Sequence, residues 1–247
     1  MMTSTAVAAP IRFGWRLRIG MLLPSSNQVS EPEMPSMLPE GVGLYTTRLK
    51  LNSGGHAAEL RMIEKVEEAA ELLADADVHL IAFHCTGVTT LNPEMPGNLK
   101  RRIHDATGKP AVVTSEGVLA ALQRFDAKRI VLISPYGQQT NDDEVAFFAH
   151  HGIEVVHEFG LNLHSGAEFS NVDPQTWYRL GMQHRRDDID AYFFSCATIR
   201  AAPMIDTLER DLGKPVITSN QSMMWHALRA GGIRERVPGF GKLFTLD

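Results

Sequence analysis

The chain has two cysteines, Cys85 and Cys196, and each comes where a short apolar run gives way to a predicted helix start. A thiolate is a strong nucleophile near neutral pH, and a thiol can also transfer a proton. Backbone amides at a helix N-terminus lower the pKa of a thiol and can bind an anion. A single cysteine in such a place is usually a small buried hydrophobe. Two cysteines in matching surroundings favour a catalytic pair.

The two cysteines occupy matching positions of an internal repeat. The interval from Pro24 to Cys85 is 61 positions, and the interval from Pro135 to Cys196 is the same. Three segments recur in outline and in the same order, namely 18–24 as 129–135, 77–85 as 188–196, and 108–115 as 213–219. Single matches between apolar runs arise by chance, so the order and the spacing carry the inference. The repeat predicts two similar halves related by pseudo-twofold symmetry, with one cysteine on each side of a single cleft.

Short β-branched runs alternate with amphipathic segments of helical length, such as Ala57–Asp75, along nearly the whole chain. This alternation is typical of α/β proteins with parallel, Rossmann-like sheets. Ligands of such sheets bind beyond the carboxyl ends of the strands, so the residues after each strand matter most. The predicted strands are Leu17–Leu23, Gly43–Leu49, Val78–Phe83, Ala111–Thr114, Arg129–Ile133, Glu154–Phe159, Ala191–Phe194 and Val216–Thr218.

The repeat also predicts the domain organisation. Residues 1–15 are interpreted as a flexible N-terminal extension without the charged start and apolar stretch of a signal peptide. Residues 16–125 together with 219–247 form the first predicted domain, because the last segment is expected to pack back across the boundary. Residues 126–218 form the second predicted domain.

Three polar residues follow predicted strands and are candidates for substrate binding. Ser25 and Asn27 come after the first strand, where neutral donors could hold a carboxylate, although both residue types also favour helix N-caps. Tyr136 stands at the matching place of the second half and could donate to a substrate oxygen. A half-buried aromatic with its hydroxyl in water is the alternative. Thr114-Ser115 and Thr218-Ser219 could line the cleft from each side or act as caps.

Composition excludes several classes of protein. A net charge of −5, a pI near 6.1 and the lack of any basic run argue against a nucleic-acid partner. No run of 18 apolar residues predicts a membrane span. Two cysteines without a secretory signal indicate reduced thiols in the cytoplasm. No zinc-ligand spacing, phosphate loop or dinucleotide motif is found, so we expect no metal and no cofactor.

These residues resemble the aspartate/glutamate/hydantoin racemase superfamily, within the branch of maleate cis-trans isomerase, arylmalonate decarboxylase and the ectoine-utilisation racemase-like proteins. The resemblance runs from Arg16 to the C-terminus. It rests on Pro24-Ser25-Ser26-Asn27, the strand ending at Cys85, Pro135-Tyr136, Ser195-Cys196, Thr218-Ser219-Asn220-Gln221 and Trp225-His226-Ala227-Leu228.

The resemblance implies two Rossmann-like domains, an active site between them, and a small carboxylate substrate turned over without a cofactor. It implies that Cys85 is the nucleophile and Cys196 the acid/base partner. Asn27 and Tyr136 would hold carboxylate oxygens. The backbone amides of the residues after each cysteine would assist, namely Thr86, Gly87, Ala197 and Thr198.

Conversion of maleate to fumarate is the leading hypothesis from this resemblance. Racemisation of an amino acid or hydantoin and decarboxylation of an arylmalonate are the alternatives, and the arylmalonate decarboxylases have glycine where this chain has Cys85. A carboxylate-binding protein without turnover is the alternative outside enzymes. Association into a homo-oligomer stays open at this point.

Overall fold

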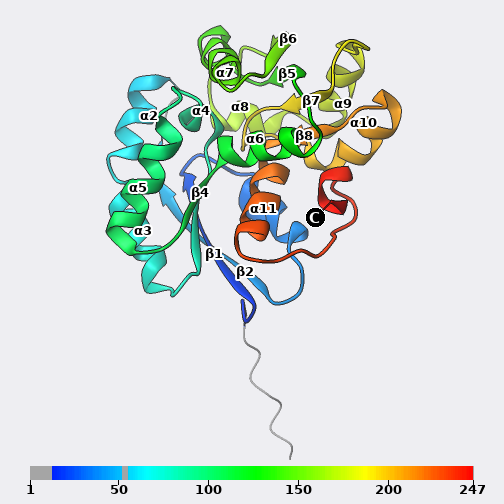
Figure 1. Ribbon diagram of the computed structural model, residues 1–247. Helices are drawn as coiled ribbons and strands as arrows, with labels where there is room; N and C mark the ends of the chain where they lie inside the picture. Colours follow the sequence, from blue (N-terminus) through cyan, green and yellow to red (C-terminus); the bar gives the residue numbers. More distant parts are fainter. Residues whose placement is uncertain (1–12, 52–54, 247) are drawn as a thin grey trace, which may run out of the picture.

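The computed structural model describes residues 13–51 and 55–246 of the chain. Each half forms a four-stranded parallel sheet flanked by helices (Figure 1). The strand order is β2-β1-β3-β4 in the first sheet and β6-β5-β7-β8 in the second, so the two halves share one topology. The predicted α/β fold with two similar sheets is confirmed. The strands are Leu17–Pro24 (β1), Val42–Leu49 (β2), Leu80–Phe83 (β3), Ala111–Val113 (β4), Arg129–Ser134 (β5), Glu154–Gly160 (β6), Ala191–Phe194 (β7) and Val216–Thr218 (β8).

The helices fill the intervals between strands. Those of the first half are α1 (Ser30–Glu33), the 3-10 helix η1 (Met34–Met37), α2 (His56–Ile63), α3 (Val66–Asp75), α4 (Thr86–Thr89), α5 (Met95–Thr107) and α6 (Thr114–Arg124). Those that follow are α7 (Gln138–His150), α8 (Gly166–Asn171), α9 (Pro174–Gln183), η2 (Ala202–Met204), α10 (Ile205–Leu212), α11 (Ser219–Ala230) and η3 (Lys242–Thr245).

The sequence predicted one continuous helix where the structure has two. The amphipathic pattern over Ala57–Asp75 belongs to two helices, α2 and α3, which are separated by Glu64 and Lys65. The apolar side chains on both sides of the break are buried, so the periodicity continues through it. A hydrophobic pattern reports the buried face and not the backbone angles, and therefore could not reveal the interruption.

The repeat extends to individual side chains. Arg18 at the start of β1 donates to the backbone carbonyl and the carboxylate of Asp77. Arg129 at the start of β5 makes the same two contacts with Asp188. These pairs tie each central strand to the turn before its neighbour, β3 or β7. The halves therefore superpose in sequence order, as the repeat predicted.

The hydrophobic core consists of two clusters, of which the larger one extends through both halves. Alternate residues of β1 divide between the two faces of the first sheet: Leu22 packs with α2, α3 and α5, whereas Met21 and Leu23 belong to a second cluster. That second cluster continues past α6 and α11 into the second sheet and includes Leu132 and Phe193. In Figure 1, α6 and α11 lie between the two sheets. Parallel strands buried on both faces explain the nearly unbroken apolar runs of the sequence.

The predicted domain boundaries stay a prediction. Helix α11 contacts β3, β4, α6 and η1 of the first half, as expected for residues assigned to the first domain, and it also contacts β8. Most of the predicted N-terminal extension, residues 1–12, lies outside the described residues. Within the described ranges, no helix has the length and apolar character needed to cross a membrane.

We expect the two halves to unfold in one transition, because the larger cluster of the core extends through both. Leu132→Ala in β5 removes a fully buried side chain and should lower the free energy of unfolding by about 2–5 kcal/mol. Urea unfolding followed by tryptophan fluorescence and by far-UV circular dichroism should give coincident curves. The control is Leu72→Ala, whose side chain is exposed and whose effect should stay within about 0.5 kcal/mol. Two separated transitions, with only one shifted by Leu132→Ala, would contradict a shared core.

Candidate functional site

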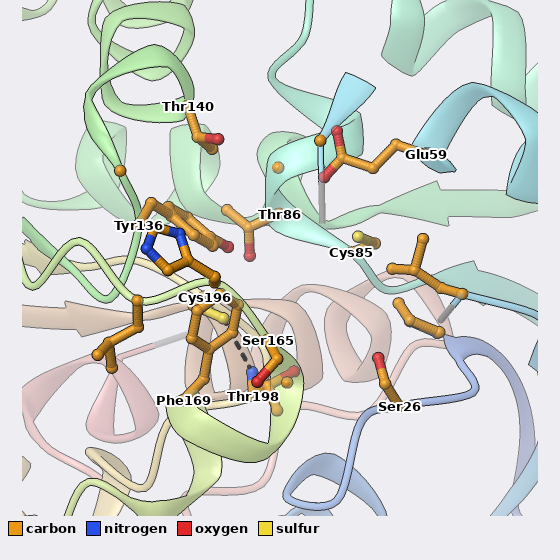
Figure 2. A pocket seen from close by; sticks show the side chains of 18 of the residues that line it. Ser26, Glu59, Cys85, Thr86, Tyr136, Thr140, Ser165, Phe169, Cys196 and Thr198 are labelled. Carbon is orange, nitrogen blue, oxygen red and sulfur yellow. Dashed lines mark hydrogen bonds between the residues drawn. The ribbon is translucent and has the colours of Figure 1, made fainter. Parts of the chain in front are cut away.

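A pocket of about 510 Å³ lies where the carboxyl ends of the central strands of the two sheets meet. Cys85 follows β3 and Cys196 follows β7, and both line this pocket. Pro24 at the end of β1 and Tyr136 just after β5 also line it. Figure 2 shows the two thiols entering the same space from different parts of the chain. One residue after each of the four central strands therefore reaches one cavity, as the strand-end rule predicted.

Cys85 is half-buried and precedes the single turn of α4 in extended backbone, with φ −154°. Burial raises the pKa of its thiol well above the usual range, and the neighbouring Glu59 carboxyl raises it further. The backbone N–H of Val88 in α4 lowers this pKa, as expected at a helix N-terminus, but burial outweighs it. The single turn of α4 provides few aligned amides, and they do not offset the loss of water around the sulfur.

Cys196 has a different backbone conformation. Its φ is 109°, in a region that residues with a side chain rarely adopt, and the surrounding contacts must hold it there. Its sulfur accepts a hydrogen bond from the backbone N–H of Thr198 at 3.3 Å and one from the hydroxyl of Tyr136. Burial raises the pKa of Cys196 to about 11, and these two donors oppose the rise. Cys196 is therefore the more acidic of the two thiols.

One serine connects the two cysteine loops. Ser219, the first residue of α11, is fully buried. Its hydroxyl oxygen accepts a hydrogen bond from the hydroxyl of Thr86 at 2.8 Å and one from the backbone N–H of Cys196 at 3.1 Å. The sequence suggested only a cleft-lining or capping role for this residue. Its place at the start of α11 instead fixes the residue after Cys85 relative to Cys196.

The next residue, Asn220, fixes the strand end that carries Cys85. Its side-chain oxygen bonds the ring Nε2 of His84 at 2.7 Å, and its amide donates to Glu33 at 2.6 Å. Burial lowers the pKa of His84 to about 4, so the ring is neutral at pH 7 and donates from Nε2 to the asparagine oxygen. Burial also raises the pKa of Glu33 to about 7, while the Asn220 amide opposes this rise.

The second half has a counterpart of this buried carboxyl. Glu144 lies nine residues after Pro135, as Glu33 lies nine after Pro24. The hydroxyl of Ser195, the residue before Cys196, donates to Glu144 at 2.6 Å. Burial raises the pKa of Glu144 to about 8. Sequence analysis missed both glutamates, although extending the repeat by nine residues beyond each proline would have found them.

Most of the predicted site residues line the pocket. They are Cys85, Thr86, Gly87, Tyr136, Cys196, Ala197 and Thr198. Ser25 and Asn27 are not among its lining residues. The hydroxyl of Ser25 bonds the backbone of Leu51. Asn27 is 1% exposed, accepts from the backbone N–H of Ser30, and donates to the carbonyl of Ala197. Ser25 is thus an exposed residue that connects the end of β1 to Leu51, two residues after β2, whereas Asn27 is buried and holds the backbone at the start of α1.

Several lining residues were not predicted from the sequence. They come from segments between strands: Ser26, which lies within the motif at residues 24–27, and Glu59, Thr140, Asn162, Ser165 and Phe169, which no motif marks. Figure 2 labels all of them except Asn162. Glu59 belongs to the polar face of α2, which in sequence looks like any solvated helix face. In the part of the chain that the structure describes, no group of three or more His, Cys, Asp or Glu side chains is arranged to hold a metal ion.

The sequence pattern of the family described as arylmalonate decarboxylase matches residues 19–244. The chain belongs to this family. A maleate isomerase of Geobacillus stearothermophilus is 26% identical over 243 residues, which cover 92% of this chain and 97% of that relative. The chain is thus similar to proteins named for two reactions, an isomerisation and a decarboxylation.

Solved structures of maleate isomerases share the fold. A cysteine-to-alanine variant of the isomerase Iso from Pseudomonas putida S16, solved with maleate, has a TM-score of 0.89 at 23% identity and covers 93% of this chain and 97% of its own. A cysteine-to-serine variant of the Nocardia farcinica maleate cis-trans isomerase, which carries a covalently bound succinylcysteine intermediate, has a TM-score of 0.88 at 22% identity. The match covers 92% of this chain and 98% of that one.

The buried carboxyl of Glu144 should make stability depend on pH. Its pKa is raised in the folded state, so the folded protein holds a proton that the unfolded chain releases above pH 4.5. Its contribution to the free energy of unfolding therefore falls as pH rises from about 4.5 to about 8, by up to about 1.4 kcal/mol per pH unit. Glu144→Gln should remove this contribution to the slope of the free energy of unfolding against pH. Urea unfolding at a series of pH values measures it.

The matched control for this experiment is Glu94→Gln, because Glu94 is exposed. That variant should keep the slope of the unsubstituted protein. An unchanged slope in Glu144→Gln would contradict the protonated, buried state of this carboxyl.

Proposed function

We propose that this protein is a cofactor-independent isomerase that interconverts the cis and trans forms of a small unsaturated carboxylate, with maleate to fumarate as the leading case. The observation that carries the proposal is the presence of two free thiols, Cys85 and Cys196, in one pocket. Two relatives by fold support it, because one holds maleate and another holds a succinylcysteine.

The two thiols divide the chemistry between them. Cys85 releases its thiol proton to solvent, and the resulting thiolate adds to one carbon of the double bond while the π electrons move to the other carbon, next to a carboxylate. Cys196 gives that carbon its proton, which leaves a thioether on Cys85 and a single bond that can rotate. Cys196 then removes the proton, the double bond forms again in the trans arrangement, and Cys85 leaves as thiolate. No atom or electron is gained or lost over the cycle.

The surroundings of each sulfur suit its role. Cys196 is the more acidic thiol and already accepts hydrogen bonds from Tyr136 and Thr198, which stabilise its thiolate after proton transfer. Cys85 is the less acidic thiol, and a less acidic thiol gives the more reactive thiolate once the proton is lost. Negative charge on the reacting carboxylate is stabilised by the Tyr136 hydroxyl and by amides of Thr86, Gly87, Ala197 and Thr198.

The second thiol distinguishes isomerisation from decarboxylation, the other reaction for which the family is named. A decarboxylase needs one group to protonate the carbanion that remains after carbon dioxide leaves. It has no use for a second thiol that adds to carbon. Cys85 therefore favours addition to a double bond. Racemisation also uses two opposed acid/base groups, and incorporation of solvent deuterium at an α-carbon with loss of chirality would identify it.

We place the protein in the cytoplasm with both thiols reduced, since a disulfide would remove both the nucleophile and the acid. The substrate is its expected partner. Association into a homo-oligomer stays a prediction.

The first test separates the two cysteines. Cys85→Ala should abolish isomerisation, because no nucleophile remains. Cys196→Ser should slow turnover at least 100-fold and accumulate an adduct on Cys85, because proton transfer is impaired after addition. NMR in deuterium oxide measures turnover of maleate, and intact-protein mass spectrometry measures a gain of one substrate molecule. The variant carrying both changes has no cysteine and is the control without adduct. Full activity in either single variant would overturn the mechanism.

The second test concerns cofactors. Dialysis against EDTA followed by gel filtration should leave kcat/KM for maleate within about twofold of the untreated value, because the steps above need only side chains of this chain. Metal analysis and the absorbance spectrum of the treated protein check that nothing remains bound. Loss of activity that zinc, another metal or a nucleotide restores would contradict the proposal.

A further inference from the structure

Glu59 places a carboxyl group in the pocket, on the side of Cys85. It comes from α2, is half-buried, and lines the cavity. A methyl group placed on Gly87 would lie 3.2 Å from its Oε1, so the carboxyl rests against the backbone two residues after Cys85. Figure 2 shows Glu59 on the same side of the pocket as Cys85 and Thr86.

No lysine or arginine among the described residues compensates the charge of Glu59 inside the pocket, and only His56 opposes the rise of its pKa. Among the described residues that line the cavity, none is lysine or arginine. His56, one turn before Glu59 on α2, bonds Asp143 of α7 through its Nε2 at 2.5 Å. That histidine is thus already paired with another carboxylate. Burial raises the pKa of Glu59, His56 lowers it, and Asp143 raises it further.

The opposite side of the pocket presents neutral donors. Tyr136, Asn162, Ser165 and Thr198 carry hydroxyl or amide groups, and all four belong to the second half of the chain. A carboxylate can accept hydrogen bonds from such groups without meeting a like charge. The imidazole of His164 lines the same side and is exposed. The two ends of the pocket therefore differ in the charge that they accept.

A substrate with a carboxylate at both ends would bind this pocket less tightly than its monoamide. Its second carboxylate would meet Glu59 in a site of low dielectric, where like charges repel strongly or force one group to take up a proton. A neutral primary amide avoids both costs and can donate its N–H groups to Glu59. The amide can donate to Glu59 whether Glu59 is ionised or protonated, since both forms have an oxygen that accepts a hydrogen bond.

We propose that Glu59 selects a singly charged substrate, the monoamide of a cis-unsaturated dicarboxylic acid, bound with its amide at Glu59 beside Cys85 and its carboxylate among the neutral donors beside Cys196. This inference rests on the proposed function, because it says which end of the substrate lies beside each of the same two thiols. It gives this chain a preference for the monoamide over the dicarboxylate named for its relatives.

The test compares maleate with maleamate, its monoamide, as substrates. The unsubstituted protein should have a kcat/KM at least tenfold higher for maleamate. Glu59→Gln removes the charge but keeps an oxygen that accepts, so it should raise kcat/KM for maleate tenfold or more while changing kcat/KM for maleamate by less than about threefold. NMR detects the cis and trans forms of both compounds.

The matched control is Glu64→Gln, which removes the same charge directly after α2, at an exposed position that does not line this pocket. It should leave the ratio of the two kcat/KM values within twofold. A ratio that changes equally in Glu64→Gln would assign the effect to net charge. Equal losses for both substrates in Glu59→Gln would assign a structural role to Glu59. Either result overturns the selection.

A binding measurement on the unsubstituted protein keeps the proposal testable if Glu59→Gln fails to fold. Succinate and succinamate are the saturated counterparts of the two substrates and cannot react with a thiol. Calorimetry should show succinamate binding at least tenfold more tightly than succinate, and succinate binding with uptake of a proton. Tighter binding of succinate without proton uptake would overturn the selection.

The outcomes also separate this inference from the proposed function. Efficient turnover of maleate together with no turnover of maleamate would overturn the selection and leave the isomerase intact. No turnover of either compound, with no adduct on Cys85 in Cys196→Ser, would overturn both.

Discussion

The site depends on the first turn of α11, where Ser219 and Asn220 hold both cysteine loops. Ser219 joins Thr86 to the backbone of Cys196, and Asn220 holds the ring of His84, the residue before Cys85. These groups are buried, so a missing partner would leave a desolvated donor or acceptor at a cost of about 1–3 kcal/mol. Helix α11 therefore sets the position of one thiol relative to the other.

The repeat places the two cysteines at equivalent positions. The residues around them differ between the two halves, so the two thiols differ in backbone conformation and acidity. Cys85 has an ordinary extended backbone, whereas Cys196 is held at φ 109° with its sulfur near two donors. Glu59 approaches Cys85, and in the second half Tyr136 approaches Cys196. Catalysis with one nucleophile and one acid needs such a difference. A fully symmetric pair would have equal acidities and no preferred direction for the substrate.

Much of the fold and part of the site could be predicted from the sequence. Strands such as Arg129–Ser134 and Ala191–Phe194 are short apolar runs buried on both faces, and hydrophobicity alone marks them. The equal interval from Pro24 and Pro135 to the two cysteines placed both thiols at equivalent strand ends. Parallel topology then required that these ends meet at one edge of each sheet. Residue type, order along the chain and spacing were sufficient for these features.

Only the tertiary structure decided the electrostatics and the lining of the site. The sequence predicted thiols of lowered pKa, but burial raises both values, and burial depends on neighbours distant in the chain. Asn27 looked like a substrate ligand, and folding instead directs its amide to Ala197, 170 positions away. Glu59 looked like part of a solvated helix face until α2 packed beside Gly87. Local sequence determined which residues end the strands, whereas the packing of the two halves determined which of their polar groups lost water and which faced the cavity.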